Sequence, residues 1–134
     1  MPVIEAIPLQ MIQLFTNLIS NALKFGKKNE PLEINIHAAV VLKEELAMRK
    51  IAGNAVYYKI EVRDNGIGFE QENADKIFTI FQRLHGRAEY DGTGIGLAIC
   101  KKIVQNHYGA IYADAAVNAG ACFTIFLPET QVNK

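Results

Sequence analysis

The stretch Asp64-Asn65-Gly66-Ile67-Gly68-Phe69 follows a run of alternating apolar and polar residues, and Gly92-Thr93-Gly94-Ile95-Gly96-Leu97 precedes an apolar run with helical spacing. The first stretch therefore closes a predicted strand, and the second opens a predicted helix. A carboxylate at the end of a strand can accept a hydrogen bond, and free amides at the start of a helix favour an anion. The pair indicates a pocket that holds a base at one end and phosphates at the other.

The composition excludes several classes of protein. The chain has 134 residues, enough for one domain with a core, and its 14 basic and 14 acidic residues balance. A neutral chain without a basic run does not favour nucleic-acid binding. It has neither a signal peptide nor an apolar run of ~18 residues, the length of a membrane span. We therefore expect a single cytoplasmic domain over residues 1–134, without membrane contact and cut from a longer protein.

Hydrophobic periodicity divides the chain into helices and strands. We predict long helices over Pro8–Phe25 and Ile95–His107, and a short helix within residues 70–85. The predicted strands are Leu32–Val41, Val56–Asp64, Ala110–Ala113 and Cys122–Leu127. Residues 43–52 are rich in helix formers but lie between two strands, so a helix and an extended arm both stay open. Grouped strands with long helices predict an α+β fold, a two-layer α/β sandwich with helices over one face of the sheet.

The first predicted helix carries polar residues on a second face. At about 100° per residue, Asn17, Asn21 and Lys24 share a narrow arc, away from the apolar face. One interpretation is a solvated surface, but asparagine is a mediocre helix former and such surfaces favour Glu and Lys. The other interpretation is a ligand face, because amide oxygens suit Mg²⁺ and a lysine suits a phosphate.

The predicted strand ending at Asp64 directs this carboxylate inward, in phase with Ile60 and Val62. An inward carboxylate is costly unless something donates a hydrogen bond to it, and an exocyclic amine such as that of adenine would serve. The alternative is an Asp-Asn-Gly hairpin turn. Glycine at positions 66 and 68 would let a flat ligand approach the backbone.

The second glycine stretch by itself is weak evidence for an anion site. Gly92, Gly94 and Gly96 open a helix, as in anion sites, but tight turns explain many such runs. A Walker loop would need Lys-Ser/Thr after its last glycine, and a Rossmann fingerprint would follow a strand directly. Neither condition is met here.

Four motifs, taken in their order along the chain, together resemble those of the ATP-binding catalytic domain of sensor histidine kinases. They are Asn17-x-x-x-Asn21-Ala22-x-Lys24-Phe25, residues 64–69, Phe78-x-x-Phe81 and residues 92–99, and they match the N, G1, F and G2 boxes of that family. The resemblance covers Gln10 to Pro128, and within it residues 81–104 especially resemble phytochrome-like and PAS-linked kinases. It implies the Bergerat fold, with a mixed but mainly antiparallel sheet and ATP held between helices and a mobile lid.

The resemblance also implies site residues. Asn21 would coordinate Mg²⁺, with Asn17 and Lys24 as the other catalytic residues at the phosphates, while Asp64 would accept from the adenine amine. The further cofactor-binding residues that it implies are Phe25, Gly66, Gly68, Phe78, Phe81, Arg83, His85, Gly92, Thr93, Gly94, Gly96 and Leu97. Residues 82–91 would form the ATP lid, in which Arg83 and His85 could offer a cation to the γ-phosphate.

Two features set the expected chemistry and partners. Hydrolytic ATPases of the same fold carry a glutamate where this chain has Asn17, and an amide cannot take a proton from water. None of His37, His85 and His107 lies in the His-Glu/Asp context of a phosphoacceptor. We therefore expect ATP-dependent transfer to a histidine on a dimerisation domain of the same protein, then to a response regulator, with the isolated domain monomeric. A hydrolytic ATPase and a nucleotide-binding module without kinase activity are the alternatives.

One departure from the family and the two cysteines give structural expectations. The usual Gly-x-Gly turn before the last strand is replaced by Asn118-Ala119-Gly120, and asparagine tolerates a left-handed backbone. Cys100 and Cys122 lie in apolar surroundings without a metal or redox spacing, so buried reduced thiols are expected.

Overall fold

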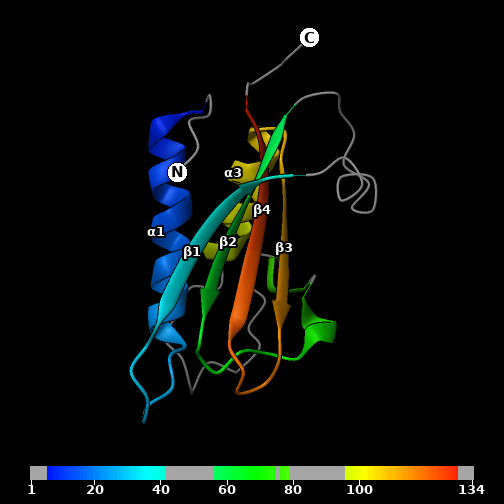
Figure 1. The fold of residues 1–134 in the computed structure, drawn as a ribbon. Helices are drawn as coiled ribbons and strands as arrows, with labels where there is room; N and C mark the ends of the chain where they lie inside the picture. The colour runs from blue at the N-terminus through cyan, green and yellow to red at the C-terminus, as the bar shows by residue number, and fades with distance from the viewer. Residues whose placement is uncertain (1–5, 42–55, 75, 79–95, 130–134) are drawn as a thin grey trace.

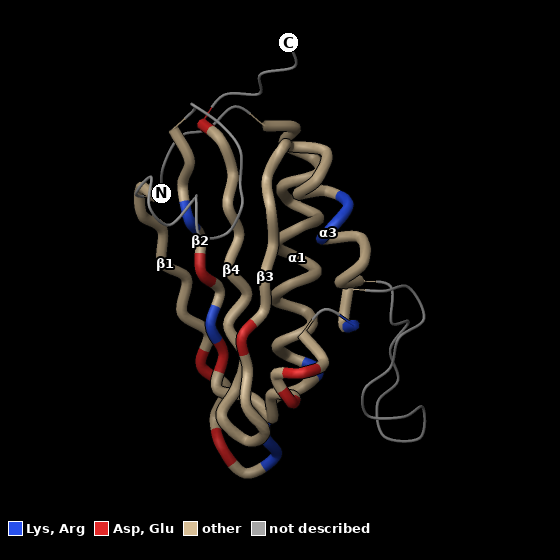
Figure 2. The backbone as a smooth tube through the Cα atoms, turned by 90° about the vertical axis from the view of Figure 1, so that its right-hand side faces the viewer, with Lys and Arg blue, Asp and Glu red and all other residues tan. Residues whose placement is uncertain are grey.

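A four-stranded sheet and two long helices form the two layers of the protein (Figures 1 and 2). The computed structural model describes residues 6–41, 56–74, 76–78 and 96–129. The elements are α1 (Pro8–Lys24), β1 (Ile34–Val40), β2 (Tyr57–Asp64), the 3-10 helices η1 (Gln71–Asn73) and η2 (Lys76–Phe78), α3 (Gly96–Asn106), β3 (Ala110–Ala115) and β4 (Ala121–Pro128). The predicted α+β sandwich is confirmed.

The sheet has the strand order β1-β2-β4-β3. All of the described pairings are antiparallel, in agreement with the mainly antiparallel sheet that the family resemblance implied. The register sets Asp64 at the end of β2 opposite Ile34 of β1 on one side and Ala121 of β4 on the other. Figure 2 shows α1 and α3 together on one side of the strands.

The core lies between the sheet and the helices, and β4 is central to it. Every residue of β4 is buried, and its alternate residues from Ala121 to Leu127 belong to this core. Phe123 meets Phe78 of η2 edge to face, with ring centroids 6.2 Å apart and planes at 79°. Such an aromatic pair adds about 1 kcal/mol beyond its buried area. Leu14 and Leu18 of α1 cover the same core.

The opposite face of the sheet carries a smaller apolar cluster. Tyr57 shares its face of β2 with the charged residues 59, 61 and 63, yet it is buried together with Val41 and Phe126. Tyr112 meets Phe126 edge to face, with centroids 5.9 Å apart. The second face of the sheet is therefore partly apolar, which strict alternation along β2 did not predict.

Several local predictions can be compared with the structure. The predicted short helix in residues 70–85 is wrong in kind, since the described part of it forms the two 3-10 turns η1 and η2. Asn118 has φ of 61°, which confirms the left-handed backbone. Cys100 and Cys122 are buried and unpaired, as predicted. Residues 43–52 lie outside the described residues.

His107 joins the two helices at one end of the molecule. Its ring is fully buried after the end of α3; Nε2 accepts a hydrogen bond from the Ile7 backbone N–H at 3.0 Å, and Nδ1 donates to the Ile103 carbonyl oxygen at 2.8 Å. Ile7 is the extended residue before α1, and Pro8 takes the first helical position, where its missing N–H costs nothing. His107 therefore has a structural role. None of the described helices has the length and apolar character that crossing a bilayer requires.

The substitution His107→Phe should lower the free energy of unfolding by about 2 kcal/mol, because it leaves the buried end of the Ile7 backbone N–H without its acceptor. Urea denaturation followed by circular dichroism measures the loss. His37→Phe is the matched control, since His37 is exposed on β1 and its replacement should cost under ~0.5 kcal/mol. Equal stability of the two variants would contradict this role of His107.

Candidate functional site

The end of α1 and the turn after β2 meet backbone to backbone. The Ile67 N–H donates to the Phe25 carbonyl oxygen at 2.8 Å, immediately beyond the last residue of α1. A Cβ atom added at Gly66 would lie 2.4 Å from the same oxygen, so any larger residue would push the two segments apart. This contact, which we call the α1–β2 junction (Phe25, Gly66 and Ile67), fixes α1 relative to the end of β2.

A second turn, between β3 and β4, closes on the same place. The Asn118 N–H donates to the Ile67 carbonyl oxygen. Gly68 has φ of 64°, and a Cβ there would lie 2.1 Å from the Ala116 carbonyl oxygen. The space beside Gly66 and Gly68 is thus filled by the protein's own backbone. Their predicted contact with a ligand stays a prediction, and the structure supplies a separate reason for glycine at both positions.

Asp64 lies at this junction on the helix-covered face, in phase with Ile60 and Val62 of the core. Its Oδ1 accepts a hydrogen bond from the Gly66 N–H at 2.8 Å. Burial raises the pKa of the carboxyl above its usual 3.8, although the backbone N–H groups of Gly66 and Ala121 act in the opposite direction. Because the effect of desolvation on the pKa is larger than that of these two donors, the ionised carboxylate is incompletely stabilised. A further hydrogen-bond donor, such as a ligand amine, would stabilise it.

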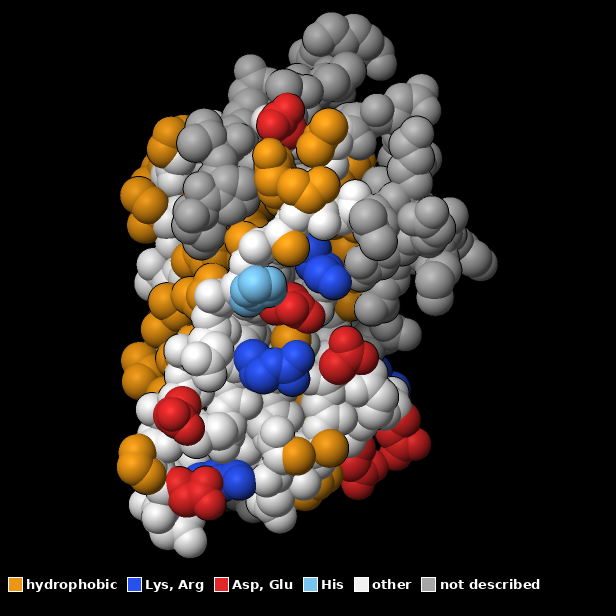
Figure 3. Space-filling model, in the orientation of Figure 1, with side chains coloured by type: hydrophobic (Ala, Val, Ile, Leu, Met, Phe, Trp, Pro, Cys, Tyr) orange, Lys and Arg blue, Asp and Glu red, His pale blue; other side chains and the backbone are white. Residues whose placement is uncertain are grey.

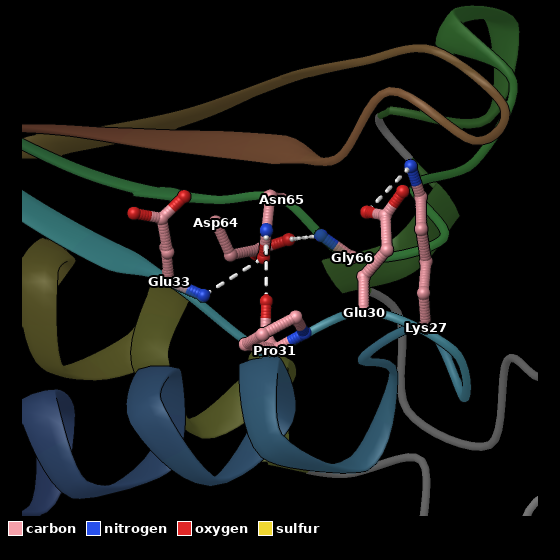
Figure 4. A network of polar contacts seen from close by, with 7 residues as sticks. All are labelled: Lys27, Glu30, Pro31, Glu33, Asp64, Asn65 and Gly66. Carbon is pink, nitrogen blue, oxygen red and sulfur yellow. Dashed lines mark hydrogen bonds and ion pairs between the residues drawn. The ribbon is translucent and has the colours of Figure 1, made fainter.

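Asn65 shapes the site, although the sequence analysis gave it no role. Its Oδ1 accepts from the Glu33 N–H at 2.9 Å, and its Nδ2 donates to the Pro31 carbonyl oxygen at 3.1 Å (Figure 4). The side chain therefore holds the segment that enters β1 beside Asp64. The Asn-Gly pair was a signal for a turn, but the two partners lie over 30 residues away and could not be identified from it.

Asn17 links the two long helices. It is partly buried, and its Nδ2 donates to the carbonyl oxygen of Gly96, the first residue of α3, at 3.4 Å. It also hydrogen-bonds the Cys100 thiol, whose pKa burial raises to about 12, so this cysteine stays a neutral thiol. The polar face of α1 is therefore an interhelical surface at Asn17, which excludes the simple solvated-face interpretation for this residue.

Asn21 and Lys24 continue the same face toward the end of α1. Asn21 is partly buried and Lys24 is exposed, and no described residue hydrogen-bonds either side chain. At the start of α3, a Cβ added at Gly96 would have no described atom within 4 Å. Two amides, an ammonium and open space beside a helix start fit a Mg²⁺-bound polyphosphate in their chemistry.

The remaining predicted residues divide into two groups. Phe78 and Leu97 belong to or pack against the core, so any effect they have on the site acts through packing. The other six, namely Phe81, Arg83, His85, Gly92, Thr93 and Gly94, lie outside the described residues. The structure therefore brings Asn17 to Gly96 and the end of α1 to the turn after β2, whereas the predicted lid lies outside the described residues.

Two glycine substitutions should distinguish a glycine that close backbone packing requires from a glycine that borders open space. Gly66→Ala should lower the free energy of unfolding by about 1–3 kcal/mol, because its Cβ would overpack against the Phe25 carbonyl. Gly96→Ala should leave it unchanged or raise it by up to ~1 kcal/mol, since alanine is the better helix former. Urea denaturation of both variants measures the difference, and a Gly96→Ala variant as unstable as Gly66→Ala would contradict the open space.

The pKa shift of Asp64 predicts a pH dependence of stability. A raised folded-state pKa means that folding favours the protonated carboxyl, and this advantage is complete below the unfolded-state value near 3.8. Wild type should therefore lose stability relative to Asp64→Asn as the pH rises through the raised pKa. Urea denaturation in steps from pH 3 to pH 7 measures the trend. Asp114→Asn, on an exposed residue of β3, is the control, and a trend of opposite sign would contradict the shift.

Comparisons with known proteins identify the family of this chain. Residues 6–131 match the family described as histidine kinase-, DNA gyrase B-, and HSP90-like ATPases. Among solved structures, the mycobacterial sensor histidine kinase MprB shares the fold, with a TM-score of 0.72 at 21% identity over 96% of this chain and 78% of its own. The catalytic domain of the histidine kinase ThkA gives a TM-score of 0.68 at 25% identity, over 96% and 73%.

The curated relatives are much longer proteins. Cyanobacterial phytochrome A of Nostoc sp. is 44% identical over 96% of this chain but only 15% of its own length. The sensor protein kinase WalK of Staphylococcus saprophyticus is 35% identical over 92% of this chain and 18% of its own length. The chain thus corresponds to a small part of each relative, and it belongs to the family of histidine kinase-, DNA gyrase B-, and HSP90-like ATPases.

Proposed function

We propose that this chain binds Mg·ATP and transfers the γ-phosphoryl group to a histidine on a separate dimerisation domain. The observation that carries the proposal is the arrangement around the α1–β2 junction. A partly buried acceptor, Asp64, lies on one side of it, and the face with Asn17, Asn21 and Lys24 runs from it along α1. The similarity to sensor kinases and phytochromes supports kinase chemistry within the family.

Each residue has a distinct part in this proposal. Asp64 accepts a hydrogen bond from the amine of the base, which selects adenine. Asn21 offers an amide oxygen to Mg²⁺, and Lys24 a point charge to a phosphate. Gly96 leaves open space for the phosphates at the start of α3. Bound Mg²⁺ would neutralise phosphate charge during transfer.

The side chain at position 17 favours transfer over hydrolysis. Asparagine has no basic site for a water proton, and the Asn17 amide nitrogen is already bound to the Gly96 carbonyl oxygen. We therefore assign Asn17 to holding α1 against the start of α3, not to activating water. An imidazole acceptor needs little activation near neutral pH, because its ordinary pKa is about 6.5.

The proposed partners follow from this chemistry. The acceptor histidine lies on a dimerisation domain of the same protein, and a response regulator receives the phosphoryl group next. The 134-residue chain is then the catalytic domain alone, cytoplasmic and monomeric by itself. Hydrolysis to free phosphate, or nucleotide binding without transfer, is the alternative function.

The first arm of the test measures nucleotide binding. Calorimetry with ADP and Mg²⁺ should show binding to wild type, and Asp64→Ala should weaken it at least ~10-fold, the equivalent of about 1.4 kcal/mol for a lost charged hydrogen bond. His37→Ala, on an exposed residue of β1, is the control and should bind as wild type. Unchanged affinity in Asp64→Ala would defeat the assignment of the pocket.

The second arm follows the phosphoryl group. The chain is mixed with a separately produced dimerisation domain and ATP labelled in the γ-position. Label on the histidine of that domain supports transfer, and Asn21→Ala should abolish it. Rapid release of labelled phosphate without labelled protein would show a hydrolase instead, and binding without either product would show a nucleotide-binding module.

A further inference from the structure

Strand β3 has one open edge, because it stands last in the strand order β1-β2-β4-β3 with no described strand beyond it. Along an antiparallel strand, the N–H and C=O of one residue point to the same side, and successive residues alternate between the two sides. The Ala116 N–H donates to the Gly120 carbonyl oxygen, which lies on the side of β4. The even-numbered residues of β3 therefore point toward β4, and Ile111, Ala113 and Ala115 direct their backbone groups to the open edge.

The side chain of Gln71 covers one end of this open edge. Its Nε2 donates to the Ala113 carbonyl oxygen at 3.1 Å, and its Oε1 accepts from the Ala115 N–H at 2.8 Å. A residue of a neighbouring parallel strand makes the same pair of bonds, since it donates to one residue and accepts from the residue two places further on. Gln71 thus takes the place of one residue of a parallel strand, opposite Asp114, and the same pattern of bonds is available to a ligand along the rest of the edge.

The rest of the open edge borders a cavity of about 460 Å³, which is within the size range of ligand sites. On the sheet side, the lining is the uninterrupted run of residues 109–114. On the helix side, the segments of η1, η2 and α3 contribute Gln71, Ala74, Phe78, Lys101 and Gln105. An extended peptide fits such a place, because backbone hydrogen bonds to the strand supply affinity and alternate side chains enter the cavity.

Lys101 determines which charge the cavity favours in its occupant. Its Nζ lies over the Phe78 ring, 6.0 Å from the ring centroid, on the helix side of the cavity. Asp114 is the single acidic residue among the described lining residues, and it alternates with Ala113 to the other face of the sheet. Figure 3 shows acidic and basic side chains mixed on that face, so it gives no preference in charge. The helix side therefore favours an occupant with a carboxylate.

The cavity lies away from the proposed nucleotide site. Figure 1 places β3 and α1 at opposite sides of the sheet, and in Figure 2 the open edge of β3 faces the viewer. The lining residues include neither Asp64 nor any residue of the polar face of α1. A ligand at this edge can therefore bind together with a nucleotide.

We infer that the open edge of β3 and its cavity bind an extended acidic peptide segment, which adds to the sheet as a strand parallel to β3. The segment accepts hydrogen bonds from the N–H groups of Ile111 and Ala113 and donates to the carbonyl oxygens of Gly109 and Ile111. The residue opposite Ile111 directs a carboxylate side chain to the helix side, toward Lys101, and the C-terminal end of the segment stops at Gln71. This inference does not rest on the proposed function.

Titration of the isotope-labelled chain with a short peptide, followed by NMR, tests the site. The probe is the acetylated and amidated pentapeptide Thr-Val-Thr-Asp-Thr, in which the two threonines that flank the aspartate bond to the edge. The amide signals of Ile111 and Ala113 should shift in a saturable way, and these amides should exchange with solvent more slowly. A peptide with lysine in place of the aspartate should bind at least ~3-fold more weakly, because it loses an ion pair. N-methylation of the two flanking threonines should abolish binding, because it removes both backbone donors.

Two lysine variants and a measurement of direction complete the test. Lys101→Glu should reverse the preference between the two peptides, whereas Lys102→Glu, on an exposed neighbour in α3 that does not line the cavity, should keep it. A nitroxide at the peptide N-terminus should broaden the amide signal of Gly109 more than that of Ala115, which lies about 20 Å further along the strand. Equal binding of the N-methylated peptide, unmoved signals along the edge, or stronger broadening at Ala115 would overturn the inference.

Discussion

The close approach of the α1 end to the turn after β2 organises this protein. The hydrogen bond from Ile67 to the Phe25 carbonyl, with glycine at position 66 to allow it, sets the helix against the edge of the sheet. Asp64 lies two residues before Gly66, and Lys24 and Asn21 lie in the last turn of α1 before Phe25. A single backbone contact thus determines where Asp64, the proposed acceptor for a base, lies relative to Asn21 and Lys24, the groups proposed for metal and phosphate.

Other contacts keep that arrangement rigid. Asn17 ties α1 to the start of α3, His107 ties the start of α1 to the far end of α3, and the Asn118 turn closes over Ile67. Each of these is a polar group satisfied by a partner distant in sequence, so the positions of the two helices do not depend on apolar packing alone. The cost of the arrangement is the desolvation of Asp64, which a donor on a ligand would relieve.

Sequence periodicity predicted the long elements well because both helices and all four described strands have one strongly apolar face. It failed where local structure is decided by tertiary contacts: residues 71–73 and 76–78 form 3-10 turns, and Tyr57 is buried on the face of β2 that also carries three charged residues. The motifs predicted Asp64 and Asn17 as site residues, and in the structure both are partly buried at contacts between elements. They could not show that Gly66 is required by the Phe25 carbonyl or that Asn65 holds residues 31–33, since those partners are far apart in sequence.

The central claim is that the α1–β2 junction separates the base end of one nucleotide site from its phosphate end. A crystal structure of the chain with ADP and Mg²⁺ tests it most directly. The account predicts the adenine amine within hydrogen-bonding distance of the Asp64 carboxylate, the amide oxygen of Asn21 on the metal, and the phosphates near Gly96. A nucleotide bound elsewhere, or an adenine that leaves Asp64 without contact, would contradict it.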